Sequence, residues 1–188
     1  MTALHKIFLS LFAALCLATT AAAGPITLTP ADADFDGNSG AGNYGPSNCE
    51  PGCINDLFGT SFNNTDLLYK ADFGNANDGQ FASSYSMDWA GDPNGGLLSF
   101  VGGPSINCLT CYLAVKDGNH DPRYYFYDIS TWDGTSDITL SGFWAQKGAI
   151  SHASIWGTTG ITVPEPGTMA MLLTGLAGLL VTRRRRAS

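Results

Sequence analysis

The sequence predicts an all-β protein, in which an antiparallel β-sandwich or jelly-roll-like domain lies between an N-terminal signal peptide and a C-terminal hydrophobic helix. Both ends carry apolar runs with basic residues beside them. The middle consists of short apolar and aromatic runs separated by Gly, Asn, Asp and Pro, and only CINDLFG (53–59) has a helical pattern. Short strands at near-regular intervals with such turns are typical of sandwiches and jelly rolls.

The first 23 residues have the layout of a secretory signal peptide. Lys6 lies in a weakly basic start, an apolar run covers residues 7–18, and small residues stand at Ala21 and Ala23. This order predicts export, with cleavage between Ala23 and Gly24.

The strands are expected in the following order along the chain. Residues 24–48 are rich in Gly, Asn and Asp and are expected to form loops. FASSYSMDW (81–89) alternates strictly between apolar and polar residues, which predicts a half-buried strand. Further strands are expected in LLSFV (97–101), CYLAV (111–115), RYYFYDIS (123–130), ITLSGFWA (138–145) and AISHASIWG (149–157), joined by the turns GDPNGG, KDGNHDP, WDGTSD and QKG. RYYFYDIS is aromatic on both faces, so it is expected to be central.

Residues 24–162 are about the length of one domain and are strongly acidic. They contain fifteen carboxylates and four basic side chains, a formal net charge of −11, against −7 for the whole chain. An anionic surface argues against nucleic acid, which requires a basic footprint. It suits solubility outside the cell and the attraction of divalent cations.

Four cysteines remain after removal of the signal peptide: Cys49, Cys53, Cys108 and Cys111. An even number in an exported chain predicts disulfides, with three possible pairings. The alternative is a zinc site made of four thiolates, because paired cysteines at short spacing can bind zinc.

Asp32, Asp34 and Asp36, followed by Gly37, match the opening of a calcium loop, in which alternate oxygens face one ion. The acid expected at position twelve is replaced by Asn43, so a complete EF-hand loop is broken. The sequence therefore predicts at most weakly bound structural calcium, and the alternative is a solvated acidic linker. No other cofactor is expected.

Candidates for catalysis are few, and no catalytic residue is predicted. His120 and His152 are the only histidines between residues 24 and 162, and neither lies beside a nucleophile motif. His152 is expected on the strand face of Ile150 and Trp156, as a satisfied, partly buried side chain. Glu50 is the only glutamate of the domain and lies between two cysteines, whereas a glycosidase needs two opposed carboxylates.

Aromatic residues between positions 124 and 156 exceed what one small core needs. Most are expected to pack in the core or at sheet edges. Exposed indole rings would present flat faces to sugar rings, and Trp132 and Trp144 are the predicted positions for such stacking.

The C-terminal segment, residues 163–188, combines three features in a fixed order. Pro164, Glu165 and Pro166 come first, an uncharged run follows from residue 169 to 181, and four arginines close it: Arg183, Arg184, Arg185 and Arg186. The run is shorter than the ~20 residues of a stable membrane span, and the arginines would stay cytoplasmic. The segment predicts a short transmembrane helix that stops transfer temporarily and is processed by an enzyme.

This segment closely resembles the PEP-CTERM sorting signal of exopolysaccharide-producing Gram-negative bacteria, with Pro164-Glu165-Pro166 as the name-giving motif. In that family an exosortase, a membrane cysteine protease or transpeptidase, acts on the motif. Residues 113–157, with the W-G-T turn at Trp132 and a G-I-S-H-like strand around His152, also resemble a segment that recurs in PEP-CTERM proteins. That resemblance implies a β-sandwich and no assigned reaction.

The resemblance implies an exported protein of the cell surface or exopolysaccharide matrix, which meets the inner membrane only transiently. Its expected partners are an exosortase and exopolysaccharide, and its expected role is structural or glycan-binding rather than enzymatic. The alternatives are a secreted enzyme acting on polysaccharide, and an ice- or surface-binding protein. The second would need a flat, regular threonine array, for which TGITV (159–163) is too short.

Overall fold

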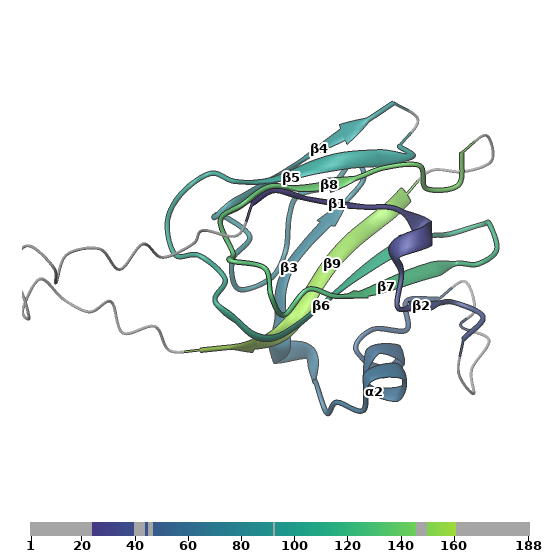
Figure 1. Cartoon of the computed structure of the whole chain (residues 1–188), viewed down its shortest axis with the longest axis horizontal. Coiled ribbons are helices and arrows are strands. Elements are labelled where there is room, and N and C mark those ends of the chain that lie inside the picture. The colour runs from purple at the N-terminus through teal and green to yellow at the C-terminus, as the bar shows by residue number, and fades with distance from the viewer. Residues whose placement is uncertain (1–23, 40–43, 45–46, 92, 146–149, 161–188) are drawn as a thin grey trace, which may run out of the picture.

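The computed structural model describes residues 24–39, 44, 47–91, 93–145 and 150–160, which form two packed β-sheets and one short α-helix (Figure 1). The predicted β-sandwich is confirmed. The predicted signal peptide (1–23) and the C-terminal segment (163–188) lie outside the described residues. Within those residues, no helix is both long and apolar enough for a membrane span.

The four-stranded sheet has the order β1 (Ile26–Leu28), β8 (Ile138–Leu140), β5 (Gly95–Phe100) and β4 (Tyr85–Ala90). The five-stranded sheet has the order β2 (Phe35–Asp36), β7 (Tyr124–Asp128), β6 (Cys108–Asp117), β9 (Ile150–Thr159) and β3 (Leu67–Asp72). The helices are α2 (Gly52–Phe58) and the 3-10 turns η1 (Pro30–Asp32) and η2 (Asn64–Asp66). The two longest strands, β6 and β9, pair with each other in the interior of the larger sheet.

Most strands lie where the sequence predicts them. β4 alternates between buried or half-buried and exposed residues, as the pattern of FASSYSMDW requires. ITLSGFWA gives only the short β8, because the chain turns at Gly142, which has a φ of 75°. α2 forms in the one window with helical periodicity and ends at Gly59 in the left-handed conformation.

Three strands and one pairing differ from the prediction. β1 and β2 lie in the part expected to be loop, and β3 was not predicted at all. β1 pairs with β8 in parallel, so the four-stranded sheet is mixed, whereas all other strand pairs are antiparallel within the described residues. This is possible because β1 enters from the distant N-terminal part of the domain rather than through a hairpin.

The five-stranded sheet is buried on both faces. Its inner face packs against the four-stranded sheet through residues such as Leu113, Tyr127 and Ile155. Its outer face is covered by α2 and the preceding loop, with Tyr124, Phe126 and other aromatics beneath them (Figure 1). Two cores in one domain account for the large number of aromatic residues. β7 is aromatic on both faces and contributes side chains to both cores.

A bulge in β9 changes the face on which His152 lies. Lys116 pairs with His152 while Asp117 pairs with Ile150, so Ser151 is skipped in the strand register with β6. Ile150 consequently joins the inner core, and His152 lies on the outer face. The prediction that His152 shares a face with Ile150 is wrong for this reason.

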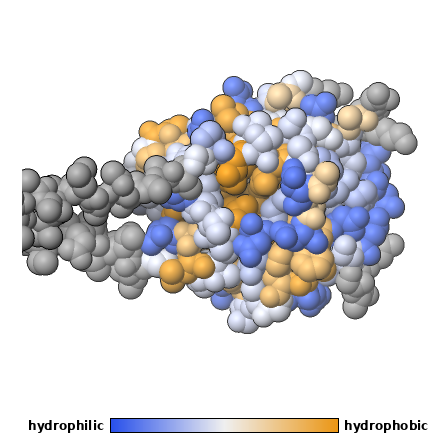
Figure 2. Space-filling view, in the orientation of Figure 1, coloured by the Kyte–Doolittle hydropathy of each residue, from blue (hydrophilic) through white to orange (hydrophobic). Residues whose placement is uncertain are grey.

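The molecular surface is mixed. Figure 2 shows hydrophilic and hydrophobic residues interspersed on one face of the domain. In the part of the chain that the structure describes, the exposed large hydrophobic residues are Phe73, Leu97, Val101 and Leu109.

Tyr85 joins two loops to the inner core. Its buried hydroxyl donates a hydrogen bond to the carbonyl oxygen of Gly134 at 2.6 Å and accepts one from the amide of Ile106 at 2.7 Å. By contrast, the equally buried hydroxyl of Tyr69 has no hydrogen-bond partner among the described residues. Burial raises the pKa of both tyrosines to about 12, so both stay neutral.

We expect Tyr85→Phe to lower the free energy of unfolding by about 1–3 kcal/mol, because a buried carbonyl and a buried amide lose their partner. Tyr69→Phe is the matched control and should be neutral or stabilising, since it removes an unpaired hydroxyl. Urea denaturation of both variants measures the difference. Equal effects of the two substitutions would contradict this account of Tyr85.

Candidate functional site

A row of polar side chains crosses the outer face of the five-stranded sheet. Asp72 on β3 pairs with His152 on β9, His152 pairs with Lys116 on β6, and Lys116 pairs with Tyr124 on β7. Paired residues on adjacent strands lie about 5 Å apart, so these four side chains are direct neighbours. Charged and polar groups are thus concentrated in a line on a largely aromatic face.

Glu50 lies over this row and connects it. Its Oε1 lies 2.6 Å from Nε2 of His152 and accepts a hydrogen bond from the hydroxyl of Ser154 at 3.3 Å. Its Oε2 accepts a hydrogen bond from the hydroxyl of Tyr124 at 3.0 Å. The side chains of Glu50 and His152 are 3% and 2% exposed, so this is a buried hydrogen-bond network rather than a surface contact.

His152 lies between two carboxylates. Besides Glu50 at Nε2, Oδ1 of Asp72 lies 3.6 Å from Nδ1. Asp72 also forms a salt bridge with Lys70 at 2.9 Å. Of these two contacts, only the one with Glu50 is within hydrogen-bond distance.

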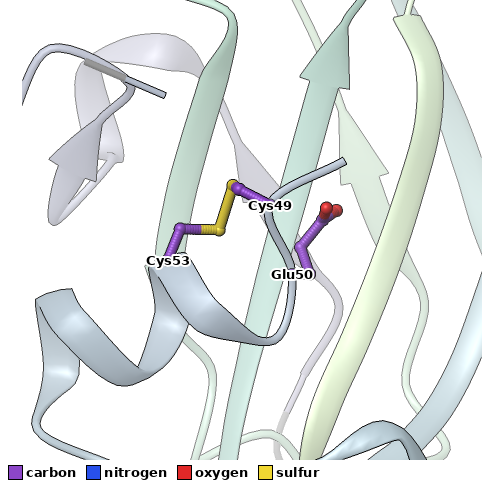
Figure 3. A group of neighbouring side chains, drawn as sticks. All are labelled: Cys49, Glu50 and Cys53. Carbon is purple, nitrogen blue, oxygen red and sulfur yellow. A yellow bond between two sulfur atoms is a disulfide. The ribbon is translucent and has the colours of Figure 1, made fainter. Parts of the chain in front are cut away.

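The Cys49–Cys53 disulfide holds Glu50 in place. It closes the turn that enters α2, the amide of Cys53 donates to the carbonyl oxygen of Cys49 at 3.1 Å, and the amide of Cys49 donates to the hydroxyl of Tyr124 at 3.1 Å. Figure 3 shows the Glu50 side chain beside the disulfide, with its carboxylate directed over the sheet. The covalent turn therefore presents one carboxylate to the polar row.

The network shifts the ionisation of its members. Burial alone raises the pKa of Glu50, but the hydrogen bond and charge of His152, with further hydrogen bonds, bring it below the ordinary value of 4.5. Burial, and then the charge of Glu50, raise the pKa of Tyr124 far above its usual range. Burial lowers the pKa of Lys116, and Arg123 and Lys70 add to this, while Glu50 and Asp117 oppose it.

A pocket of about 510 Å³ lies beside the row and is lined by three of its members, Asp72, His152 and Lys116. The strand ends of β3, β6 and β9 and the β6–β7 hairpin form its walls. Asp72, Lys116, Asp117, His120 and His152 contribute charged or titratable groups. The remaining side chains on the lining are Asn48, Phe73, Asn75, Asn119, Ile150 and Ser151.

The hairpin beside the pocket has the predicted turn chemistry. Asp117 is buried, and its Oδ1 accepts hydrogen bonds from the amides of Asn119 at 2.6 Å and His120 at 3.3 Å. Its Oδ2 lies 3.1 Å from Nδ1 of His120. The carboxylate is thus used to hold the turn.

The predicted calcium loop is not formed by Asp32, Asp34 and Asp36. Asp32 accepts hydrogen bonds from Thr29, Asp34 accepts one from the amide of Asp128, and Asp36 accepts from Asn38 and Ser39. The three carboxylates hold separate turns and strands. Among the described residues they do not form a group close enough to share one ion.

The two tryptophans predicted to stack on sugars lie in the core. Trp132 is 4% exposed and its indole donates to the carbonyl oxygen of Ser136, and Trp144 is 9% exposed and donates to that of Pro122. A buried ring offers no face to a sugar, so the prediction is wrong for these two residues.

The four cysteines form two local disulfides, Cys49–Cys53 and Cys108–Cys111, which selects one of the three possible pairings. Both pairs are oxidised, so the sulfurs are not the thiolates that a zinc site requires. Cys49, Glu50 and Cys53 lie close together, but only the carboxylate of Glu50 remains as a metal ligand there.

Sequence reasoning missed most of this site. In the sequence Glu50 stands out only as the single glutamate of the domain, and no motif marks Asp72, Phe73 or Lys116. One signal was available, because a lone glutamate inside a short cysteine loop is held more rigidly than one in an open loop.

We expect Glu50→Gln to lower the free energy of unfolding at pH 7 by about 3 kcal/mol, since it removes the carboxylate from the buried contact with His152. The folded pKa of Glu50 is depressed, so its contribution is present above pH 4.5 and is lost as the pH falls through the lower folded value. The gap between the wild type and the variant should therefore narrow below pH 4.5.

Thermal denaturation across pH measures this gap. The exposed Asp88→Asn on β4 is the control and should change stability by less than about 0.5 kcal/mol. A constant gap down to pH 2 would show that the charge of Glu50 is not what stabilises the fold.

Comparison with known proteins bears on the C-terminal segment only. No curated protein and no solved structure matches the chain. The family model of the PEP-CTERM protein-sorting motif matches residues 162–186, which include Pro164, Glu165, Pro166 and the arginines. The chain therefore carries a PEP-CTERM protein-sorting motif at its C-terminus, which implies processing by an exosortase and export to the cell surface.

Proposed function

We propose that the protein has a non-enzymatic role at the cell surface or in the exopolysaccharide matrix. Its β-sandwich domain binds glycan in the pocket beside the polar row. The sorting motif supplies the location, because it implies an exported protein. The pocket has side chains suited to binding a sugar, because it combines an aromatic ring with amides, carboxylates and a lysine. Pockets with a few oriented polar groups beside apolar surface are the usual ligand sites of proteins.

The proposal rests mainly on the position of Phe73. It lines the pocket, is 49% exposed, and packs edge-on against Trp89 with 6.2 Å between ring centroids. An exposed aromatic ring held by a second ring is a suitable platform for the apolar face of a sugar. Asn75 and Asn119, on the same lining, offer amide groups to sugar hydroxyls.

One observation favours an enzyme acting on polysaccharide as a second candidate. Asp72 and Asp117 line the same pocket, and paired carboxylates are the usual machinery of glycoside hydrolysis. Both are already bound to neighbouring groups, Asp72 to Lys70 and Asp117 to His120. Release of reducing ends from the exopolysaccharide of the same cells would favour the enzyme over the binding protein.

The sorting part of the proposal predicts the mass of the exported protein. Protein recovered from the cell surface and medium should begin at Gly24 and lack Arg183–Arg186, and it should gain four hydrogens on reduction of two disulfides. Intact-mass spectrometry before and after reduction measures this. A mass that retains the four arginines would mean a membrane-anchored protein and would contradict removal of the tail.

The binding part predicts that Phe73→Ala weakens binding to exopolysaccharide fragments from the same cells about tenfold, equivalent to about 1.4 kcal/mol. Leu97→Ala is the matched control, because Leu97 is also exposed but lies on β5, away from the pocket lining. Calorimetric titration measures both variants. Unchanged affinity of the Phe73→Ala variant would show that the pocket is not the binding site.

A further inference from the structure

Lys116 is a buried cation on the wall of the pocket. The residue is 5% exposed and lies on β6 between His152 and Tyr124, where its amine is 5.8 Å from the centre of the Tyr124 ring. It also belongs to the pocket lining. A buried ammonium is costly unless it is paired or hydrogen-bonded.

The carboxylates around Lys116 are all engaged by other groups. Asp72 pairs with Lys70, Asp117 with His120 and two backbone amides, and Glu50 with His152, Tyr124 and Ser154. No hydrogen bond or ion pair from the described part of the chain reaches Nζ of Lys116. The ring of Tyr124 compensates only part of the lost hydration, because a cation–π contact near 6 Å is a weak substitute for a carboxylate.

The ionisation of Lys116 agrees with this geometry. Burial is the largest effect on its amine and lowers its pKa, and the attraction of Glu50 and Asp117 does not reverse the shift. An anion brought into the pocket would favour the charged amine and replace the missing partner.

We propose that the pocket recognises an acidic sugar, whose carboxylate pairs with Nζ of Lys116 while its ring packs on Phe73. The inference rests on the proposed glycan-binding function and names the class of glycan. Phe73 and the amides of Asn75 and Asn119 favour a sugar over a small carboxylic acid, because they provide contacts that a small acid cannot fill. The bound ligand would make a charge-assisted hydrogen bond with the amine.

The net charge of the domain is compatible with an acidic ligand. The acidic surface repels an anionic polymer at long range, but at physiological salt this repulsion is screened beyond about 8 Å. Inside the pocket the local contacts decide, and there Asp72 and Asp117 are held by Lys70 and His120 while no partner from the described residues reaches the amine of Lys116. Lys116 is also the one lysine or arginine among the described residues of the lining, so it is the cation that an anionic ligand would meet.

The test uses the exported protein as recovered from cells and two forms of the same exopolysaccharide fragments, native and with the carboxyl groups chemically reduced to alcohols. We expect the native fragments to bind at least tenfold more tightly in calorimetric titration. Lys116→Met should remove this preference, and Lys116→Arg should retain most of it. Near-ultraviolet circular dichroism checks that both variants keep their tertiary packing.

Ser86→Asp is the control for net charge, because it makes the protein more negative by the same one unit at an exposed position of β4, away from the pocket lining. Loss of the preference in this variant as well would overturn the specific role of Lys116. Equal binding of both fragment forms would overturn the inference while leaving glycan binding intact. Binding of neither form would overturn the inference and the proposed function together.

Acetate at millimolar concentration separates a sugar from a carboxylate alone. It should not displace the native fragments, because it cannot contact Phe73. Full displacement by acetate would show a general carboxylate site and would overturn the assignment to a sugar.

Discussion

The buried contact between Glu50 and His152 holds the outer layer of the protein on the sheet. Glu50 comes from the covalently closed turn before α2, and His152 comes from the central strand β9. Breaking such a pair by removing one partner costs several kcal/mol, because the other group remains buried. The short helix α2 could not stay folded by itself, since helices of this length are marginal without tertiary contacts.

This attachment explains why the five-stranded sheet has a second core. Once the turn and α2 cover the outer face, Tyr124 and Phe126 become as buried as the residues between the sheets. They stack nearly parallel, with ring centroids 5.3 Å apart. The polar row then lies at the border between this aromatic core and the pocket, so one layer both stabilises the sheet and forms one wall of the site. A small domain gains its two apolar layers in this way without a third sheet.

The sequence predicts local features of this protein well and long-range ones poorly. Strict alternation predicted β4, and the run with aromatic residues on both faces predicted a central position for β7, which lies between β2 and β6, because each is a property of a few adjacent residues. β3 was missed because LLYKAD has no strict alternation, even though Asn64 and Asp66 precede it and Gly74 and Asn75 follow it. Glu50 and His152 are 102 residues apart, so no spacing rule connects them. The exposure of Phe73 and the burial of Trp132 depend on which loops cover which face, and aromatic side chains alone do not reveal this.

The direction of β9 has a consequence for where the pocket lies. Its first residues, Ile150 to His152, line the pocket, and the last described residue lies one position beyond the other end of the same strand. Ten residues of extended chain span about 33 Å. The pocket therefore lies about 30 Å from the last described residues, at the opposite end of β9 from the side of the domain that precedes the sorting motif.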